Sequence, residues 1–231
     1  MILWSVWNDI NLYTHTRGIN RFLGLVLFLE QMESRGHTVP GLTQLKRWTV
    51  TSPTLSNQSL QDRISDTSEP IFQKALHWSI EVNQRIKELP SMPLPFEGVE
   101  ECLTQISRSA DIAVVSSANS DALEAEWTHA GLKQYARILM SQSYGTKDFC
   151  LKALSEYGYE RRRILMVGDS PGDLTAAENA GILFYPILTG HEADSWKRLK
   201  MESFPILKAG NYDAAYQKQL IDLFKTNLRK R

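Results

Sequence analysis

One stretch of this 231-residue chain limits its fold more than any other, namely residues 164–181, ILMVGDSPGDLTAAENAG. The apolar run Ile164–Val167 predicts a short buried strand of a parallel sheet. A glycine then lets the chain turn sharply, and Asp169 and Asp173 follow it. From Asp173 onward, small and helix-forming residues predict a helix that the next glycine ends. Because ligands bind outside the carboxyl ends of the strands in open α/β sheets, both aspartates are expected at a binding crevice.

Two interpretations of these aspartates follow from this stretch alone. Two carboxylates at a strand end, with no lysine or arginine beside them in the sequence, suit a hard cation such as Mg2+. Alternatively, Asp169 simply ends a strand and Asp173 caps a helix, as aspartates often do. The rest of the chain has to decide between the two.

The charge balance, cysteine content and hydropathy pattern exclude several classes of protein. Lys+Arg and Asp+Glu both number 26, so no global field favours nucleic acid or an anionic membrane surface. The two cysteines are not in a CxxC arrangement, which fits a reducing compartment. The longest apolar run, residues 22–29, is about ten residues too short to span a membrane, and the N-terminal residues lack the basic flank of a signal peptide. We therefore expect a soluble cytoplasmic protein with no nucleic-acid or membrane partner, while the sequence leaves its oligomeric state open.

The chain changes character near residue 93. Residues Ile2–Trp7 are apolar and predict a first strand, which delivers Asp9 at its carboxyl end. Residues 17–92 then show mostly helical spacing, and the proline-rich segment 89–95 is interpreted as a stiff hinge. After the hinge, strand and helix patterns alternate. The later strands are expected within residues 111–115, 135–140, 164–167 and 182–188. Apolar residues at helical spacing also predict a long amphipathic helix over residues 71–86 and a last helix over residues 214–224.

This order of elements predicts an α/β protein. Alternating strands and helices are the pattern of a Rossmann-like, doubly wound parallel sheet, and the long helical stretch after the first strand is the pattern of an inserted domain. We expect residues 1–16 and 93–231 to form the core and residues 17–92 to form an α-helical cap domain.

Four separated elements resemble the haloacid dehalogenase (HAD) superfamily in their order and in their positions at strand ends. Asp9 resembles its nucleophile, Ser116 the hydroxyl residue that ends strand two, and Lys147 the lysine before the helix that leads to strand four. Residues Gly168–Asp173, GDSPGD, resemble its acidic metal motif. A single serine or lysine of this kind is usually a surface residue, whereas all four in this order are specific. The resemblance implies that strand one lies in the middle of the sheet, so that Asp9, Ser116 and the acidic motif converge on one crevice.

The first motif departs from the pattern of the superfamily's phosphatases. They have Asp-x-Asp-Gly-Thr at the end of strand one, whereas this chain has Asp9-Ile10-Asn11-Leu12-Tyr13. Asn11 therefore replaces the second aspartate, which is the general acid and base of those enzymes. An amide cannot transfer a proton, and general acid–base catalysis contributes about 10²–10⁴-fold in rate. The backbone carbonyl of Asn11 can still bind a metal ion.

The resemblance implies a role for each candidate in catalysis and substrate binding. Asp9 would attack the phosphoryl group, while Ser116 and Lys147 would bind its oxygens and stabilise developing charge. Arg17 and Arg21 lie just past the first motif, where they either contact an anionic substrate or are surface arginines of the first cap helix. The catalytic candidates are thus Asp9, Asn11, Ser116 and Lys147, and the substrate-binding candidates are Ser116, Ser117, Asn119, Lys147 and Arg17.

The resemblance also implies Mg2+ as the cofactor. Asp9, Asp169 and the carbonyl of Asn11 would hold the ion, which would supply the counter-charge that a carboxylate needs to approach a phosphate. Asp173 would be a further ligand or a partner that orients the metal's water molecules. The metal-site candidates are therefore Asp9, Asn11, Asp169 and Asp173.

These candidates predict a HAD-type hydrolase, a Mg2+-dependent phosphatase that acts on a small phosphorylated metabolite through an aspartyl-phosphate on Asp9. One alternative is a phosphonate or carbon–halogen hydrolase of the same superfamily. The superfamily's dehalogenases need no metal, so Asp169 and Asp173 argue against that branch. The other alternative, from a different class, is a non-catalytic binding or regulatory protein on a degenerate HAD scaffold. Asn11 and the two residues after it support this alternative, because they depart from the phosphatase motif.

Overall fold

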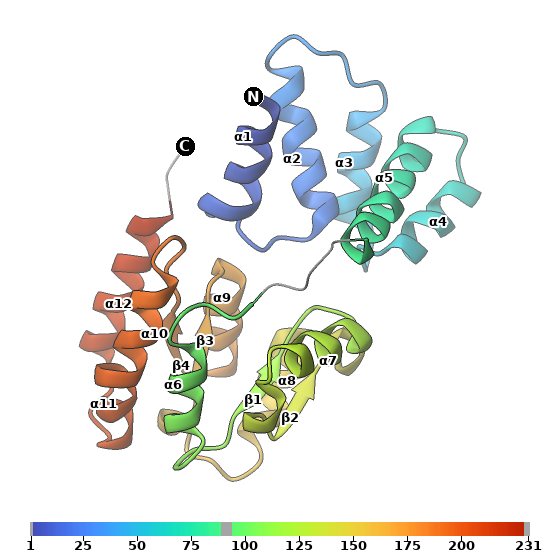
Figure 1. Cartoon of the computed structure of the whole chain (residues 1–231). Helices are drawn as coiled ribbons and strands as arrows, with labels where there is room; N and C mark the ends of the chain where they lie inside the picture. Colours follow the sequence, from blue (N-terminus) through green and yellow to red (C-terminus); the bar gives the residue numbers. More distant parts are fainter. Residues whose placement is uncertain (1, 89–93, 229–231) are drawn as a thin grey trace. The chain divides into compact units, whose positions relative to one another are not determined.

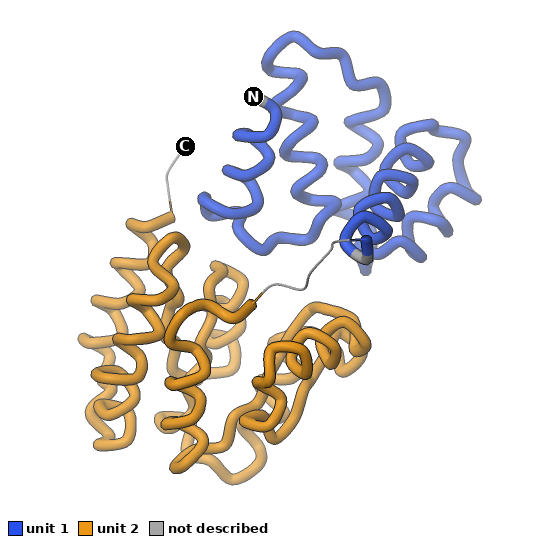
Figure 2. Tube along the Cα trace, in the orientation of Figure 1, with its two compact units in different colours: residues 1–91, 231 blue, residues 92–230 orange. Residues whose placement is uncertain are grey.

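The chain divides into two compact units, which we call unit 1, residues 1–91, and unit 2, residues 92–230 (Figure 2). The computed structural model describes residues 2–88 and 94–228, so the larger part of the expected hinge lies outside the described residues. The sequence predicts residues 1–16 as part of the core, and in the structure they belong to unit 1 together with the segment expected to form the cap.

All regular elements of unit 1 in the described residues are helices (Figure 1). Local signals explain where several of them begin. The Asn20 side chain caps one helix by accepting a hydrogen bond from the N–H of Phe22, Ser56 and Ser59 form a capping box at another, and Pro70 opens the longest. The elements are α1 (Ile2–Asn8), the π-helical turn η1 (Asp9–Tyr13), α2 (Arg21–Glu33), α3 (Leu42–Thr51), α4 (Asn57–Ser65) and α5 (Pro70–Lys87).

The prediction of a first strand at Ile2–Trp7 is wrong, because this segment forms helix α1. Short apolar runs do not distinguish a strand from a buried helix by periodicity, and here the tertiary contacts favour the helix. Val6 and Ile10, four residues apart, are buried in one cluster with Met32 of α2. The ring of Trp7 packs edge-on against Phe28 and Trp78, with centroid distances of 5.7 and 5.6 Å.

Helices α2 to α5 enclose a core of their own, in which α2 packs on α3 and α4 packs on α5. Its most deeply buried side chains are those of Phe22, Leu45, Leu60 and Phe72, each at most 1% exposed. Four such side chains, at about 1.5–3 kcal/mol of transfer free energy each, are a substantial stabilisation of the helical arrangement. The helix expected over residues 71–86 is confirmed as α5, and its N-terminal half supplies Ile71, Phe72 and Ala75 to this core, whereas Ile86 is exposed.

Unit 2 confirms the expected alternation of strands and helices. Strands β1 (Ala113–Val115) and β2 (Ile138–Met140) pair in parallel, and so do β3 (Leu165–Gly168) and β4 (Leu183–Pro186). The remaining elements up to β4 are α6 (Val99–Ile106), α7 (Ser120–His129), α8 (Lys147–Ser155) and α9 (Pro171–Ala180), with 3-10 turns η2 (Lys133–Tyr135), η3 (Gln142–Tyr144) and η4 (Arg161–Arg163).

The two strand pairs form two separate sheets in the described residues, whereas the sequence predicts one doubly wound sheet. β1 and β3 are each hydrogen-bonded to a strand along one edge only. The segment expected to lie between them as the central strand is α1 of unit 1, which accounts for the difference. The protein is thus a mixed α/β chain, mostly helical, with short parallel strands.

The C-terminal residues add helices that the sequence pattern predicts only in part. The last helix, α12 (Ala214–Asn227), is confirmed, whereas α10 (Glu192–Arg198), the π-helical turn η5 (Leu199–Ser203) and α11 (Phe204–Lys208) were not expected. A buried cluster joins them to β4 and α6, and includes Cys102, Tyr185, Leu199, Phe204, Leu207, Tyr212 and Leu220. Among the described helices, none has both the length and the apolar character that crossing a membrane requires.

Candidate active site

The end of β3 carries a tightly bonded turn built around Asp173. One carboxylate oxygen, Oδ2, accepts hydrogen bonds from the backbone N–H groups of Asp169 and Ser170, each at 3.1 Å. In return, the N–H of Asp173 donates to Oγ of Ser170 at 3.2 Å, which completes a capping box at the start of α9. A Cβ at position 168 would lie 2.4 Å from the Cβ of Asp173, so the turn requires Gly168 for close approach rather than for an unusual backbone angle.

The other oxygen of Asp173 holds Lys147, the first residue of α8. Lys147 Nζ donates to Asp173 Oδ1 at 2.5 Å, and the two side chains are 29% and 3% exposed. The lysine is placed there because the hydroxyl of Thr146 caps α8 by accepting from the N–H of Phe149 at 3.2 Å. The sequence has no lysine next to these aspartates, but the fold brings Lys147 into contact with Asp173. Both oxygens of Asp173 are engaged by protein donors, so direct metal ligation by Asp173 would require Lys147 to move.

The loop after β1 holds the other substrate-binding candidates of unit 2. Ser116 follows β1 directly, its N–H donates to the carbonyl of Met140, and its Oγ accepts from the N–H of Ala118 at 3.1 Å. Asn119 caps α7 through its Oδ1, which accepts from the N–H of Ala122 at 2.9 Å. Ser117, between them, is exposed. Asn119 therefore has a local structural function, whatever its role toward a substrate.

Three further hydroxyls near this loop were missed by the sequence reasoning. Ser141 follows β2 as Ser116 follows β1, and its Oγ lies 2.6 Å from that of Ser120 and 2.7 Å from that of Ser143. Ser141 is only 2% exposed, so this hydroxyl cluster ties the start of α7 to the turn after β2. The sequence signal that could have revealed this cluster is Ser141 itself, because it follows the third expected strand directly, as Ser116 follows the second.

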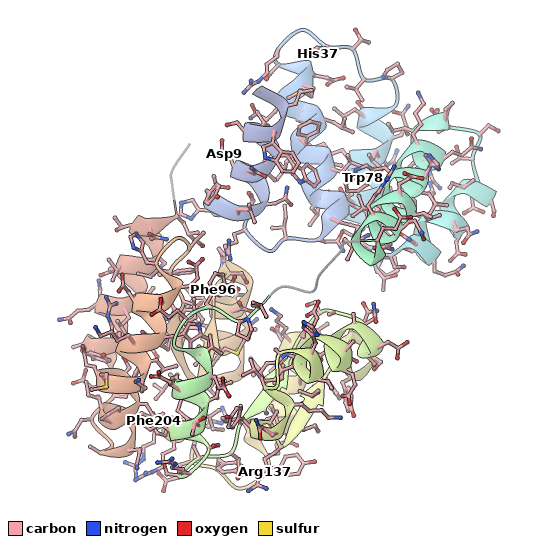
Figure 3. The ribbon with its side chains drawn as sticks, viewed as in Figure 1. Asp9, His37, Trp78, Phe96, Arg137 and Phe204 are labelled. Carbon is pink, nitrogen blue, oxygen red and sulfur yellow. The ribbon has the colours of Figure 1, made fainter. Side chains whose placement is uncertain are left out.

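Asp9 and Asn11 lie on the π-helical turn that follows α1 in unit 1; Figure 3 labels Asp9 there. Asp9 is buried, with 9% of its surface exposed. The side-chain amide of Asn11 donates to the carbonyl of Trp7 at 2.8 Å, and Arg17 donates through Nη1 to the carbonyl of Leu12 at 2.9 Å. The structure thus describes Asp9, Asn11 and Arg17 within unit 1, and Ser116, Ser117, Asn119, Lys147, Asp169 and Asp173 within unit 2.

The donor chemistry for a magnesium ion is present in part. Asp169 is half-buried directly after β3, and one or two carboxylates with water and substrate oxygens are a sufficient ligand set for Mg2+. Within residues 2–88 and 94–228, no group of three or more His, Cys, Asp or Glu side chains is gathered in a way that could hold a metal ion. Asp169 therefore fits the role of a magnesium ligand, while Asp173 fits the role of a partner that positions Lys147.

The comparison with protein families agrees with this arrangement. The model of a family described as haloacid dehalogenase-like hydrolase matches residues 41–187, which is more than half of the chain. The chain belongs to this family. The match includes Ser116, Lys147, Asp169 and Asp173 but begins after Asp9, so the atypical first motif lies outside it. No curated protein and no solved structure matches the chain.

Family membership indicates a hydrolase and implies a Rossmann-like core with a cap, and members commonly use Mg2+. It does not specify the bond that is cleaved, the substrate or the residues that act on it. Those assignments depend on the geometry described above.

Proposed function

We propose that this protein is a Mg2+-dependent phosphatase that acts on a small phosphorylated metabolite. The observation that carries the proposal is the pair of Lys147 and the buried Asp173 at the end of β3. An ammonium group has three N–H donors, and Asp173 accepts from one of them, which leaves two for the oxygens of a phosphoryl group. A donor held in advance by a buried carboxylate stabilises developing negative charge without having to reorganise during the reaction.

In the proposed reaction, the carboxylate of Asp9 attacks phosphorus and the bond from phosphorus to the ester oxygen breaks, so that an aspartyl-phosphate forms and an alkoxide leaves, which takes a proton from water. Water then attacks phosphorus, the bond to Asp9 breaks, and inorganic phosphate is released. Asp169 would hold a magnesium ion, and the ion would neutralise charge between nucleophile and phosphate.

Asn11 determines which substrates would react well. Its amide cannot protonate the departing alkoxide or activate water, so esters with poor leaving groups should react slowly. Its side chain is bonded to the carbonyl of Trp7, which gives it a structural role in η1. That bond is also the specific support for the second candidate function, a non-catalytic binding or regulatory protein, because it shows Asn11 used for structure rather than chemistry.

The experiment that tests the proposal compares Asn11→Asp with the wild type on an aryl and an alkyl phosphate, with and without Mg2+. Placing a carboxyl group beside the Trp7 carbonyl raises the pKa of the new group, which favours its acid function. We expect turnover to rise by up to about 10²–10⁴-fold, with the larger gain on the alkyl ester. Asp9→Asn should abolish activity in both backgrounds. If Asn11→Asp gains nothing and Asp9→Asn loses nothing, the phosphatase assignment fails and the binding protein takes its place.

A further inference from the structure

Unit 1 contains a half-buried cationic side chain, Arg21, that is not among the proposed catalytic residues. Arg21, the first residue of α2, points its Nη1 toward α5, where it donates to Oδ1 of Asn83 at 2.7 Å. The same nitrogen donates to Oγ of Ser79 at 3.1 Å and to the carbonyl of Ser79 at 3.3 Å. Ser79 is fully buried and passes its own hydroxyl hydrogen to Oδ1 of Asn57 at 2.7 Å. Arg21 is therefore held in place by neutral groups of α5, and Asn57 of α4 in turn bonds Ser79.

Among the described side chains, no carboxylate compensates this charge. Each acceptor of Arg21 is an amide oxygen, a hydroxyl or a backbone carbonyl, and within the described residues Arg21 forms no ion pair. Desolvation by burial lowers the pKa of Arg21, with no opposing contribution from a nearby acid. A buried charge is normally paired, because removing it from water without a counter-charge is costly. The site thus has one positive charge that no side chain in residues 2–88 and 94–228 neutralises.

Several N–H groups at and near Arg21 have no protein acceptor within the described residues. Its Nε and Nη2 donate to no acceptor in residues 2–88 and 94–228, and an arginine side chain presents these N–H groups as a planar fork. The Oδ1 atoms of Asn57 and Asn83 already accept bonds within the network. The NH2 groups of both amides donate to no protein acceptor in the same range, so each can donate to a ligand.

We propose that Arg21, Asn57 and Asn83 form an oxyanion-binding site in unit 1, which takes a carboxylate or phosphate group. The planar fork of an arginine matches the paired oxygens of such a group, and the two amides add neutral donors that recognise oxygen without repelling it. This site is separate from the phosphoryl-binding residues proposed above and does not depend on the phosphatase assignment.

The test measures thermal unfolding of the full chain against increasing acetate, a carboxylate without a phosphoryl group, at constant ionic strength maintained with chloride. We expect Tm to rise by about 3–6 °C at ten times the Kd of the anion. Arg21→Met should remove the rise. Arg85→Met is the matched control, because Arg85 lies on α5 with its side chain 77% exposed and should leave the rise unchanged. Lys147→Met should also keep it, which separates this site from the proposed catalytic lysine.

Asn83→Asp provides a second variant with the opposite signature. It places a carboxylate at the atom that Arg21 already contacts, so Tm without added anion should rise and the anion response should disappear. The proposal is overturned if the wild type shows no response, if Arg21→Met keeps the response, or if Lys147→Met alone removes it.

A kinetic comparison then identifies the source of the anion, and this part rests on the proposed phosphatase function. If the group belongs to the substrate, Arg21→Met raises KM for phosphate esters that carry a carboxylate and leaves KM for neutral esters unchanged. If the anion is a free effector, KM is unchanged for both classes while the thermal response stays. Either kinetic result is compatible with the proposed site, because the thermal-unfolding measurements decide whether the site exists.

Discussion

The ion pair between the buried Asp173 and the half-buried Lys147 leads to a quantitative prediction about stability. In Asp173→Ala, the N–H groups of Asp169 and Ser170 lose their acceptor, the capping box of α9 is lost, and the ammonium of Lys147 loses its counter-charge. Removing one partner of a buried ion pair costs about 3–5 kcal/mol. In Lys147→Met, the aspartate keeps its two backbone donors, so we expect a smaller loss of about 1.5–3 kcal/mol.

The assay is urea-induced unfolding of the two single variants and the double variant, followed by far-UV circular dichroism. Because the two side chains are in direct contact, their effects should not add, and a coupling energy of roughly 1–3 kcal/mol is expected. A coupling energy of zero, together with a loss below about 1 kcal/mol in Asp173→Ala, would refute the reasoning that the carboxylate holds the lysine. Unchanged m-values would show that the comparison reports the folded state.

Three further predictions concern single positions. Gly168→Ala should destabilise the protein by about 1–3 kcal/mol in the same assay, because its methyl group would overlap the side chain of Asp173. Gly172→Ala is the control: its Cβ would meet only the Ser170 hydroxyl, at 3.5 Å, so stability should stay unchanged or rise slightly. Burial raises the pKa of Tyr185, so its contribution to stability is complete below about pH 10 and is lost as the pH rises further. Ultraviolet titration should show this tyrosine ionising together with unfolding. If Tyr185→Phe does not move the pH midpoint of alkaline unfolding, this expectation is contradicted. Burial also raises the pKa of Cys102 to about 11, so a thiol reagent at pH 8 should label it only after denaturation, and rapid labelling of the native protein would show that the site is open.

Much of unit 2 was predictable from the sequence because its signals are local. Short apolar runs followed by turn residues and helical patterns are properties of neighbouring residues, and strands β1 to β4 lie where those runs predict them. The strand-end position of Asp169 and the helix-start position of Lys147 could be recognised for the same reason. The helices α10 and α11 were missed because their apolar residues serve a buried cluster with β4, a contact that periodicity alone does not show.

The sequence by itself determined the α/β class, the helical character of residues 21–87 and the family to which the chain belongs, since each follows from residue patterns along the chain. Only the tertiary structure decided that Ile2–Asn8 is a helix, because packing of Trp7 against two aromatic rings outweighs the strand preference of a short apolar run. It also decided that Asp173 is paired with Lys147, 26 positions away, and that Arg21 is half-buried with no counter-charge among the described residues. Such pairings depend on which helices and strands are neighbours in space, and spacing along the chain does not encode that.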